Sequence, residues 1–135
     1  MENIPEYLEK ARARLGGFNQ LIGLEVDAVG EGCCRCSCPI EEKLLNPHGS
    51  VHGGALAALL DTAAGIAAIA SSPELRSVVT QSADIHYLRP VTGKRMYCLA
   101  ETLKAGRHTG LVRAELRNEE GVLAVSATFE IFFLD

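Results

Sequence analysis

The feature that most constrains this chain is a nearly unbroken run of Ala, Leu and Ile over residues 55–70. Most of these residues are good helix formers, and a helix that is apolar on every side is expected to be buried on every side. Asp61 interrupts the run. A carboxylate inside such a helix is costly unless it is partnered or has a task in a cavity. The stretch therefore predicts a central, buried helix that carries a functional carboxylate.

Length and charge narrow the class of protein. The chain has 135 residues, which suits one domain over 1–135 with a single core. A formal net charge of -4 and the lack of a long basic run argue against nucleic acid as a partner. The apolar helix is shorter than a bilayer span, and no charged-then-apolar leader opens the chain. We expect a soluble, cytoplasmic protein with no membrane association.

Four of the five cysteines crowd one short segment, which raises the question of a metal site. Zinc motifs usually place two residues between paired cysteines, whereas Cys34, Cys36 and Cys38 alternate and would share one face of a strand. Buried cysteine behaves as a small apolar residue. We therefore predict reduced core thiols and no metal site, as is usual in a cytosolic protein.

Before the central helix, the pattern predicts one helix and a hairpin. Asn3 suits a cap and Pro5 a first helical turn, and Gly16-Gly17 is expected to end that helix. Residues 21–29 and 32–40 suit two strands joined by a turn at Gly30-Glu31-Gly32. A polar loop then leads into the central helix, which is expected to end near Pro73.

After the central helix come four strand-length runs, at residues 77–87, 95–103, 110–117 and 122–133. Apolar and polar residues alternate along the third and fourth runs with the period of two that is typical of a half-buried strand. About six strands and a single long helix favour an antiparallel sheet curled around that helix. The predicted class is α+β, with an additional helix at the N-terminus.

A sheet wrapped around one helix is the hot-dog architecture, and the motifs support it. Asn46-x-x-Gly49-x-x-His52-Gly53-Gly54 is followed by Asp61, Thr80 and Tyr87-Leu88-Arg89-Pro90. In this order they resemble the phenylacetic-acid-degradation (PaaI-like) branch of hot-dog acyl-CoA thioesterases, over most of the chain. Thr80 stands where some relatives have serine.

Thioester hydrolysis needs a donor to the carbonyl oxygen and a carboxylate that activates water or attacks directly. A backbone N–H at Gly53, at the start of the helix, suits the first role, and Asp61 suits the second. The resemblance adds Asn46 as a donor to the carbonyl and Thr80 as the residue that orients water. Each residue also has a purely structural alternative. Gly53 could be a plain helix start and Asp61 a buried structural carboxylate. Asn46 could be a turn residue, and Thr80 a β-branched strand residue. His52 either lines the pocket or is structural.

Gly53 and Asp61 lie eight residues apart, which is roughly 12 Å along one helix at ~1.5 Å per residue. One chain is therefore not expected to direct both at the same carbon. Two antiparallel helices related by a two-fold axis would bring Gly53 of one subunit near Asp61 of the other. The resemblance implies the same shared site, and a homotetramer built as a dimer of dimers.

Coenzyme A carries phosphates, so its site needs cationic or N–H-rich groups. The segment 104–108 forms a basic turn between two strands, and relatives place the nucleotide near the corresponding turn. A solvated hairpin tip would have the same sequence. The candidate contacts are Tyr87, Arg89, Lys104, Gly106, Arg107 and His108.

The resulting prediction is a thioesterase for an aryl-acetyl- or medium-chain acyl-CoA that needs no metal or redox cofactor. Two alternatives remain open. A hot-dog dehydratase would change the acyl chain without freeing coenzyme A, and a non-catalytic acyl-CoA binding protein would do neither.

Overall fold

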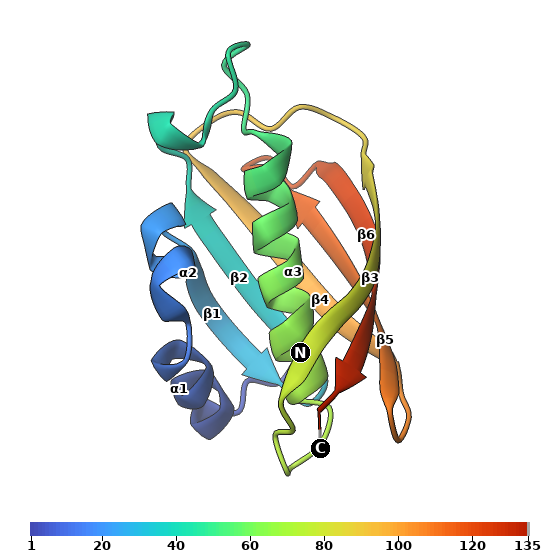
Figure 1. Cartoon of the computed structure of the whole chain (residues 1–135). Helices are drawn as coiled ribbons and strands as arrows, with labels where there is room; N and C mark the ends of the chain where they lie inside the picture. Colours follow the sequence, from blue (N-terminus) through green and yellow to red (C-terminus); the bar gives the residue numbers. More distant parts are fainter. Residues whose placement is uncertain (135) are drawn as a thin grey trace.

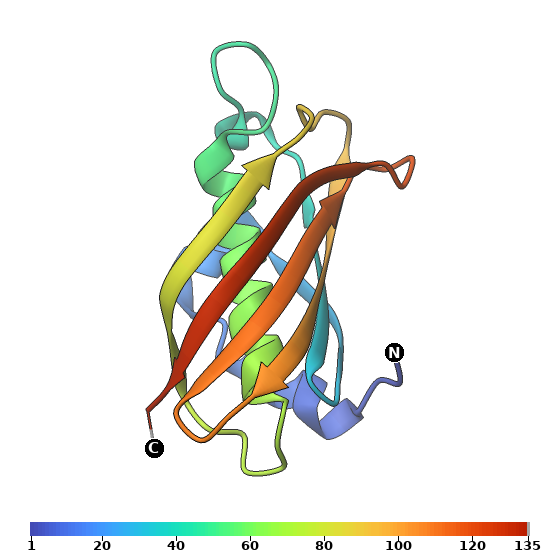
Figure 2. The same ribbon diagram turned by 90° about the vertical axis from the view of Figure 1, so that its right-hand side faces the viewer.

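A six-stranded antiparallel sheet curls around the long helix α3 (Gly53–Ile69) in the computed structural model, which describes residues 1–134 (Figures 1 and 2). The strand order is β1-β2-β4-β5-β6-β3. The strands are β1 (Glu25–Gly30), β2 (Cys33–Pro39), β3 (Val78–Tyr87), β4 (Arg95–Ala105), β5 (Thr109–Arg117) and β6 (Leu123–Phe133). This confirms the hot-dog architecture, the hairpin and the four later strands predicted from the sequence.

The core lies between α3 and the concave face of the sheet. Val112, Ala114 and Leu116 point inward and are fully buried, whereas the intervening Arg113 faces outward. Several inward positions on both layers are alanine, such as Ala64 on the helix. Because these side chains are small, the helix can lie close to the sheet, and the alternation predicted from the sequence is confirmed.

Helix α3 is not buried on every side, so that part of the prediction was wrong for the single chain. Its buried residues are Leu56, Leu59, Leu60, Ala63, Ala64, Ala67 and Ala68. Gly54 and Asp61 are exposed on the side away from the sheet. The sheet of a single chain covers only one side of α3. The apolar composition of the helix does not reveal whether anything covers its other sides.

The N-terminal segment contains two helices where one was predicted. Helix α1 (Pro5–Ala13) is followed by α2 (Gly16–Ile22), and Gly16 adopts a positive φ of 74° at the break. Gly16-Gly17 therefore begins a second helix, and residues 21–22 are helical instead of extended. The predicted Asn3 cap was also wrong, because its side chain accepts a hydrogen bond from the Val29 N–H at 2.9 Å.

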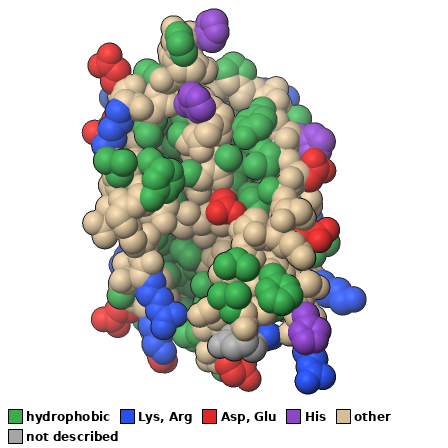
Figure 3. Space-filling view, in the orientation of Figure 1, with side chains coloured by type: hydrophobic (Ala, Val, Ile, Leu, Met, Phe, Trp, Pro, Cys, Tyr) green, Lys and Arg blue, Asp and Glu red, His purple; other side chains and the backbone are tan. Residues whose placement is uncertain are grey.

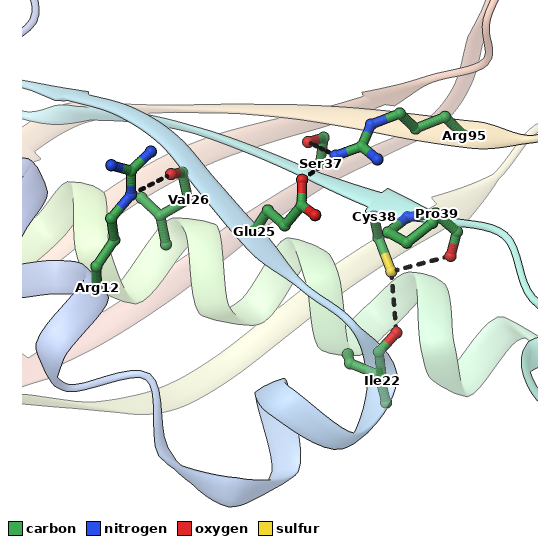
Figure 4. Close-up of polar contacts among 8 residues, drawn as sticks. All are labelled: Arg12, Ile22, Glu25, Val26, Ser37, Cys38, Pro39 and Arg95. Carbon is green, nitrogen blue, oxygen red and sulfur yellow. Dashed lines mark hydrogen bonds and ion pairs between the residues drawn. The ribbon is translucent and has the colours of Figure 1, made fainter.

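Polar contacts hold this N-terminal segment against the first hairpin (Figure 4). Arg12 Nε donates to the Val26 carbonyl at 3.0 Å, and Cys38 Sγ donates to the Ile22 carbonyl at 3.1 Å. The segment thus packs beside α3 and covers one flank of it (Figure 1). A short 3₁₀ helix, η1 (Glu42–Leu44), precedes the loop that leads into α3.

The cysteines pack as core residues, as predicted. Cys34, Cys36, Cys38 and Cys98 are buried. A hydrogen bond with Cys36, together with burial, raises the pKa of the Cys34 thiol, and burial raises the pKa of Cys38 to about 11. Within residues 1–134, no group of three or more His, Cys, Asp or Glu side chains is placed to hold a metal ion. No helix of this part of the chain is long and apolar enough to span a membrane.

Candidate active site

Asp61 lies midway along α3, on the face that the sheet does not cover, and its side chain is exposed. The Thr80 hydroxyl on β3 donates a hydrogen bond of 2.6 Å to Asp61 Oδ1. The register of β3 against β6 shifts between Thr80 and Ser82. The two residues that the sequence suggested as a catalytic pair are thus in direct contact, although 19 positions separate them.

The first turn of α3 leaves one backbone donor open. His52 is the N-cap, and its Nδ1 accepts a hydrogen bond of 2.7 Å from the Gly54 N–H. The N–H groups of Ala55 and Leu56 donate to the His52 carbonyl at 2.9 and 3.2 Å. Within residues 1–134, no acceptor takes the Gly53 N–H. This donor lies at the positive end of the helix dipole, which suits it to bind a developing oxyanion.

Tyr87 and the residues after it lie beside this helix start. The Tyr87 hydroxyl donates to the Gly53 carbonyl at 3.3 Å. A Cβ at Gly53 would lie 3.6 Å from the Tyr87 ring, an ordinary contact distance, so the ring packs directly against the helix start. Arg89 Nη1 donates to the Leu123 carbonyl at 2.7 Å. An open pocket of about 260 Å³ lies here, lined by Val51, Gly53, Leu56, Tyr87, Leu88, Arg89 and Pro90.

Asn46 makes its hydrogen bonds within its own loop. Its Oδ1 accepts from the N–H groups of His48 and Ser50 at 2.9 and 3.3 Å, and its Nδ2 donates to Ser50 Oγ at 2.9 Å. In the single chain these contacts are those of a turn residue, the alternative weighed from the sequence. Sequence reasoning missed Ser50, because no sequence pattern indicates that its side chain bonds to Asn46, four residues earlier.

The predicted basic turn lies between β4 and β5, but it is shorter than expected: Lys104 and Ala105 are the last residues of β4, and Gly106, Arg107 and His108 form the turn. It lies toward the C-terminal end of α3, far from Gly53 of the same chain (Figure 1). Sequence reasoning missed Arg76, whose Nη2 donates to the Arg107 carbonyl at 2.9 Å and whose guanidinium lies 4.4 Å from the centre of the Phe133 ring. The cationic and aromatic residues Arg76, Arg107, His108, Phe132 and Phe133 border one open pocket with Leu134.

The predicted residues therefore form three groups on one chain. Asp61 pairs with Thr80, Gly53 lies with His52 and Tyr87, and the basic turn stands apart (Figure 1). The eight-residue separation of Gly53 and Asp61 in α3 amounts to roughly 12 Å. A single thioester carbonyl does not reach both groups of one chain.

Known proteins share both the sequence pattern and the fold. The pattern of the Thioesterase superfamily matches residues 48–125. The medium/long-chain acyl-CoA thioesterase YigI of Escherichia coli is 29% identical over 126 residues, covering 82% of this chain and 81% of YigI. The acyl-coenzyme A thioesterase PaaI of Escherichia coli is 29% identical over 100 residues, covering 73% of this chain and 69% of PaaI.

Among solved structures, the conserved protein PA5202 of Pseudomonas aeruginosa superposes with a TM-score of 0.84 at 32% identity, covering 88% of this chain and 94% of that one. The matched residues 48–125 include the start of α3, Asp61, Thr80 and the Tyr87–Pro90 segment. The chain accordingly belongs to the thioesterase superfamily, whose enzymes hydrolyse thioester bonds.

Proposed function

We propose that this protein is an acyl-CoA thioesterase that hydrolyses an aryl-acetyl- or medium-chain acyl-CoA to the free acid and coenzyme A. The observation that carries the proposal is the Asp61–Thr80 pair on the open face of an otherwise apolar helix. An exposed carboxylate held by a hydroxyl at 2.6 Å, next to a surface of small residues, suits catalysis better than structural support. The names of the relatives YigI and PaaI support the substrate class.

In the proposed mechanism, Asp61 acts as the general base. Its Oδ1 accepts the Thr80 hydrogen bond, which leaves Oδ2 to take a proton from water. The Thr80 oxygen retains lone pairs that can accept a hydrogen bond from the same water and so orient it. Direct attack by Asp61 on the carbonyl is the alternative. In a single turnover in ¹⁸O-labelled water, the general-base route places the label only in the free acid, whereas label in the Asp61 carboxylate would reveal an acyl–Asp61 anhydride that water opens at the Asp61 carbon.

The oxyanion is assigned to the Gly53 N–H of a second subunit. This donor has no acceptor within residues 1–134, and removing an oxyanion donor typically costs about 10²–10³-fold in kcat. Asn46 becomes a second donor to the oxyanion if contact with the partner subunit rearranges its loop and frees its side-chain amide from Ser50. His52 orients the helix start through its bond to the Gly54 N–H and acts as a positioning residue. Carboxylate and donors together supply the hydrolysis, so the proposal includes no metal or redox cofactor.

The open face of the molecule supports a two-fold dimer. Along α3 this face carries Gly54, Ala57, Asp61 and Gly65, at a spacing that places them on one side of a helix. Strand β3 is an edge strand of ten residues, and all of them except Val78 and Ile85 are exposed. An uncovered edge of this length is a template for pairing with another chain. Hydrophobic side chains gather on both sides of α3, over α2 and over β3 (Figure 3).

A two-fold axis beside β3 would make the two helices antiparallel and place Gly53 of one subunit toward Asp61 of the other. It would also bring the basic turn of one subunit toward the helix start of its partner. Lys104, Arg107 and His108 then hold the coenzyme A phosphates, with Tyr87 and Arg89 nearer the thioester. We further propose that two such dimers form a tetramer and that the protein is cytoplasmic, where reduced core thiols are usual.

The test is release of free thiol from a panel of aryl and straight-chain acyl-CoAs. The wild-type protein is expected to release coenzyme A, and Asp61→Asn is expected to lower kcat by about 100-fold or more, the usual scale for losing a general base. If Asp61→Asn keeps more than half of the wild-type kcat, the mechanism is wrong. Enoyl product without free thiol would support the dehydratase alternative, and tight binding without any reaction would support a binding protein.

A further inference from the structure

A cavity of about 110 Å³ lies between the two N-terminal helices and α3. Three of its wall residues, Thr62, Ile66 and Ile69, come from one face of α3, and α1 contributes Tyr7 and Ala11. The remaining wall residues are Lys10, Arg14, Leu15, Asn19, Val29, Ala70 and Leu75. The prediction of a single N-terminal helix did not anticipate this cavity, because α2 supplies part of the wall.

Most of the polar groups in the wall already have partners within the protein. The Thr62 hydroxyl donates to Asn19 Oδ1 at 3.0 Å, and Asn19 Nδ2 donates to the Leu15 carbonyl at 2.8 Å. Lys10 forms an ion pair with Glu6 at 3.1 Å. The surface that remains for an occupant is mainly aliphatic and aromatic. Such a cavity favours an apolar group over a charged one.

The cavity wall begins on α3 one residue after Asp61, although neither Asp61 nor Thr80 is part of that wall. Thr62 directly follows Asp61, and Ile66 and Ile69 lie roughly 7 to 12 Å further along α3 at ~1.5 Å per residue. A thioester whose carbonyl lies at Asp61 can therefore direct its acyl group along α3 into the space beneath α1. The basic turn between β4 and β5 also lies toward the C-terminal end of α3, but on the opposite flank of the helix from α1 (Figure 1), so the coenzyme A part would leave on that side.

We infer that this cavity binds the apolar end of the acyl group and that α1 and α2 thereby set acyl selectivity within one subunit. This inference rests on the proposed thioesterase function and adds the specificity-determining site. Its volume is of the same order as the ~150 Å³ apolar cavity that accepts benzene. The chemical class of the occupant is therefore one aryl ring or a short alkyl segment.

The experiment compares kcat/KM for phenylacetyl-CoA with that for acetyl-CoA, whose acyl group is too short to reach the cavity. Ala11→Phe fills the cavity from α1. It is expected to lower the phenylacetyl-to-acetyl ratio by about tenfold or more, since a methylene-sized change in a hydrophobic pocket alters specificity 10–200-fold. Ala13→Phe is the matched control, because Ala13 lies on the same helix but is exposed and outside the cavity wall. It should leave the ratio unchanged.

A second variant, Ile66→Ala, enlarges the cavity and is expected to shift preference toward longer straight-chain acyl groups. If both variants fold cooperatively and keep the wild-type ratio and chain-length profile within twofold, the inference is overturned. If Ala11→Phe does not fold, an unchanged chain-length profile for Ile66→Ala is by itself enough to overturn the inference. Absence of thiol release from every acyl-CoA by the wild-type protein would instead refute the proposed function.

Discussion

The Thr80 hydroxyl donates a hydrogen bond of 2.6 Å to Asp61 Oδ1, joining the edge strand β3 to the middle of α3. The bond fixes one oxygen of the carboxylate, and the second oxygen, Oδ2, accepts no hydrogen bond from residues 1–134. It also links the two elements that would meet a second subunit. The proposed chemistry and the proposed assembly therefore depend on the same surface.

Replacing Thr80 tests the positioning role of this bond. Thr80→Val keeps the β-branched shape that suits a strand but removes the donor. We expect kcat to fall by about 10- to 100-fold, the scale expected when a reacting group is misplaced by about 1 Å, with KM little changed. Thr80→Ser keeps the hydroxyl and should retain most of the activity. A Thr80→Val enzyme within twofold of wild type would mean that the bond is structural only.

Removing the Gly53 N–H tests the oxyanion assignment. Proline suits the first position of a helix and lacks this N–H, and no acceptor within residues 1–134 would lose a hydrogen bond. Gly53→Pro is therefore expected to lower kcat by about 10²–10³-fold with an unchanged melting temperature. Gly53→Ala keeps the N–H, and its Cβ would meet the Tyr87 ring at an ordinary 3.6 Å. Equal losses in the two variants would argue against an oxyanion donor at this position.

Mixing two inactive variants tests whether each site is shared between subunits. In a heterodimer of Asp61→Asn and Gly53→Pro, one site would carry both lesions and the other neither. Refolding equal amounts makes half of the dimers mixed, so about a quarter of wild-type activity is expected to return. The composition of the dimers is checked by native mass spectrometry. Verified heterodimers that stay as inactive as their parents would show that each subunit holds a complete site.

The basic turn is tested with Arg107→Ala. A phosphate contact remote from the carbonyl supplies binding that is the same in the ground and transition states, so KM should rise by about tenfold with kcat nearly unchanged. An acyl-pantetheine substrate lacks the nucleotide, so its KM should be the same for Arg107→Ala and the wild-type protein. Arg113→Ala is the control, because Arg113 pairs with Glu101 at 3.3 Å on the outer face of the sheet. An unchanged KM for acyl-CoA would remove the turn from the coenzyme A site.

Alkylation tests whether the cysteines are inert core residues. Burial raises the pKa of Cys98 and raises that of Cys38 to about 11. A raised pKa lowers the thiolate fraction at any pH below it, and only the thiolate reacts. At pH 8, iodoacetamide should therefore modify at most the half-buried Cys33 in the native protein, and all five cysteines after denaturation. Mass spectrometry that finds Cys34 or Cys36 rapidly labelled in the native protein would contradict this packing.

Several features followed from local sequence patterns. The period of two in β5 placed Val112, Ala114 and Leu116 inward, because successive side chains of a strand point to opposite faces. The apolar run predicted α3, and Pro73 predicted the region of its end. The order of the motifs indicated the family that the comparisons confirm. These features depend on near neighbours in the chain and on motif order, both of which the sequence displays directly.

The site contacts depended on tertiary structure. The contact of Thr80 with Asp61, the exposed flank of α3 and the cavity beneath Ala11 each require two segments distant in the sequence to pack together. The second N-terminal helix, α2, also depends on a long-range contact, because its Asn19 accepts a hydrogen bond from Thr62 on α3. Composition showed that α3 is apolar, but only the arrangement of the sheet and the N-terminal helices decided which of its faces is buried. The sequence by itself thus determined the elements and the family, whereas long-range packing decided which side chains meet.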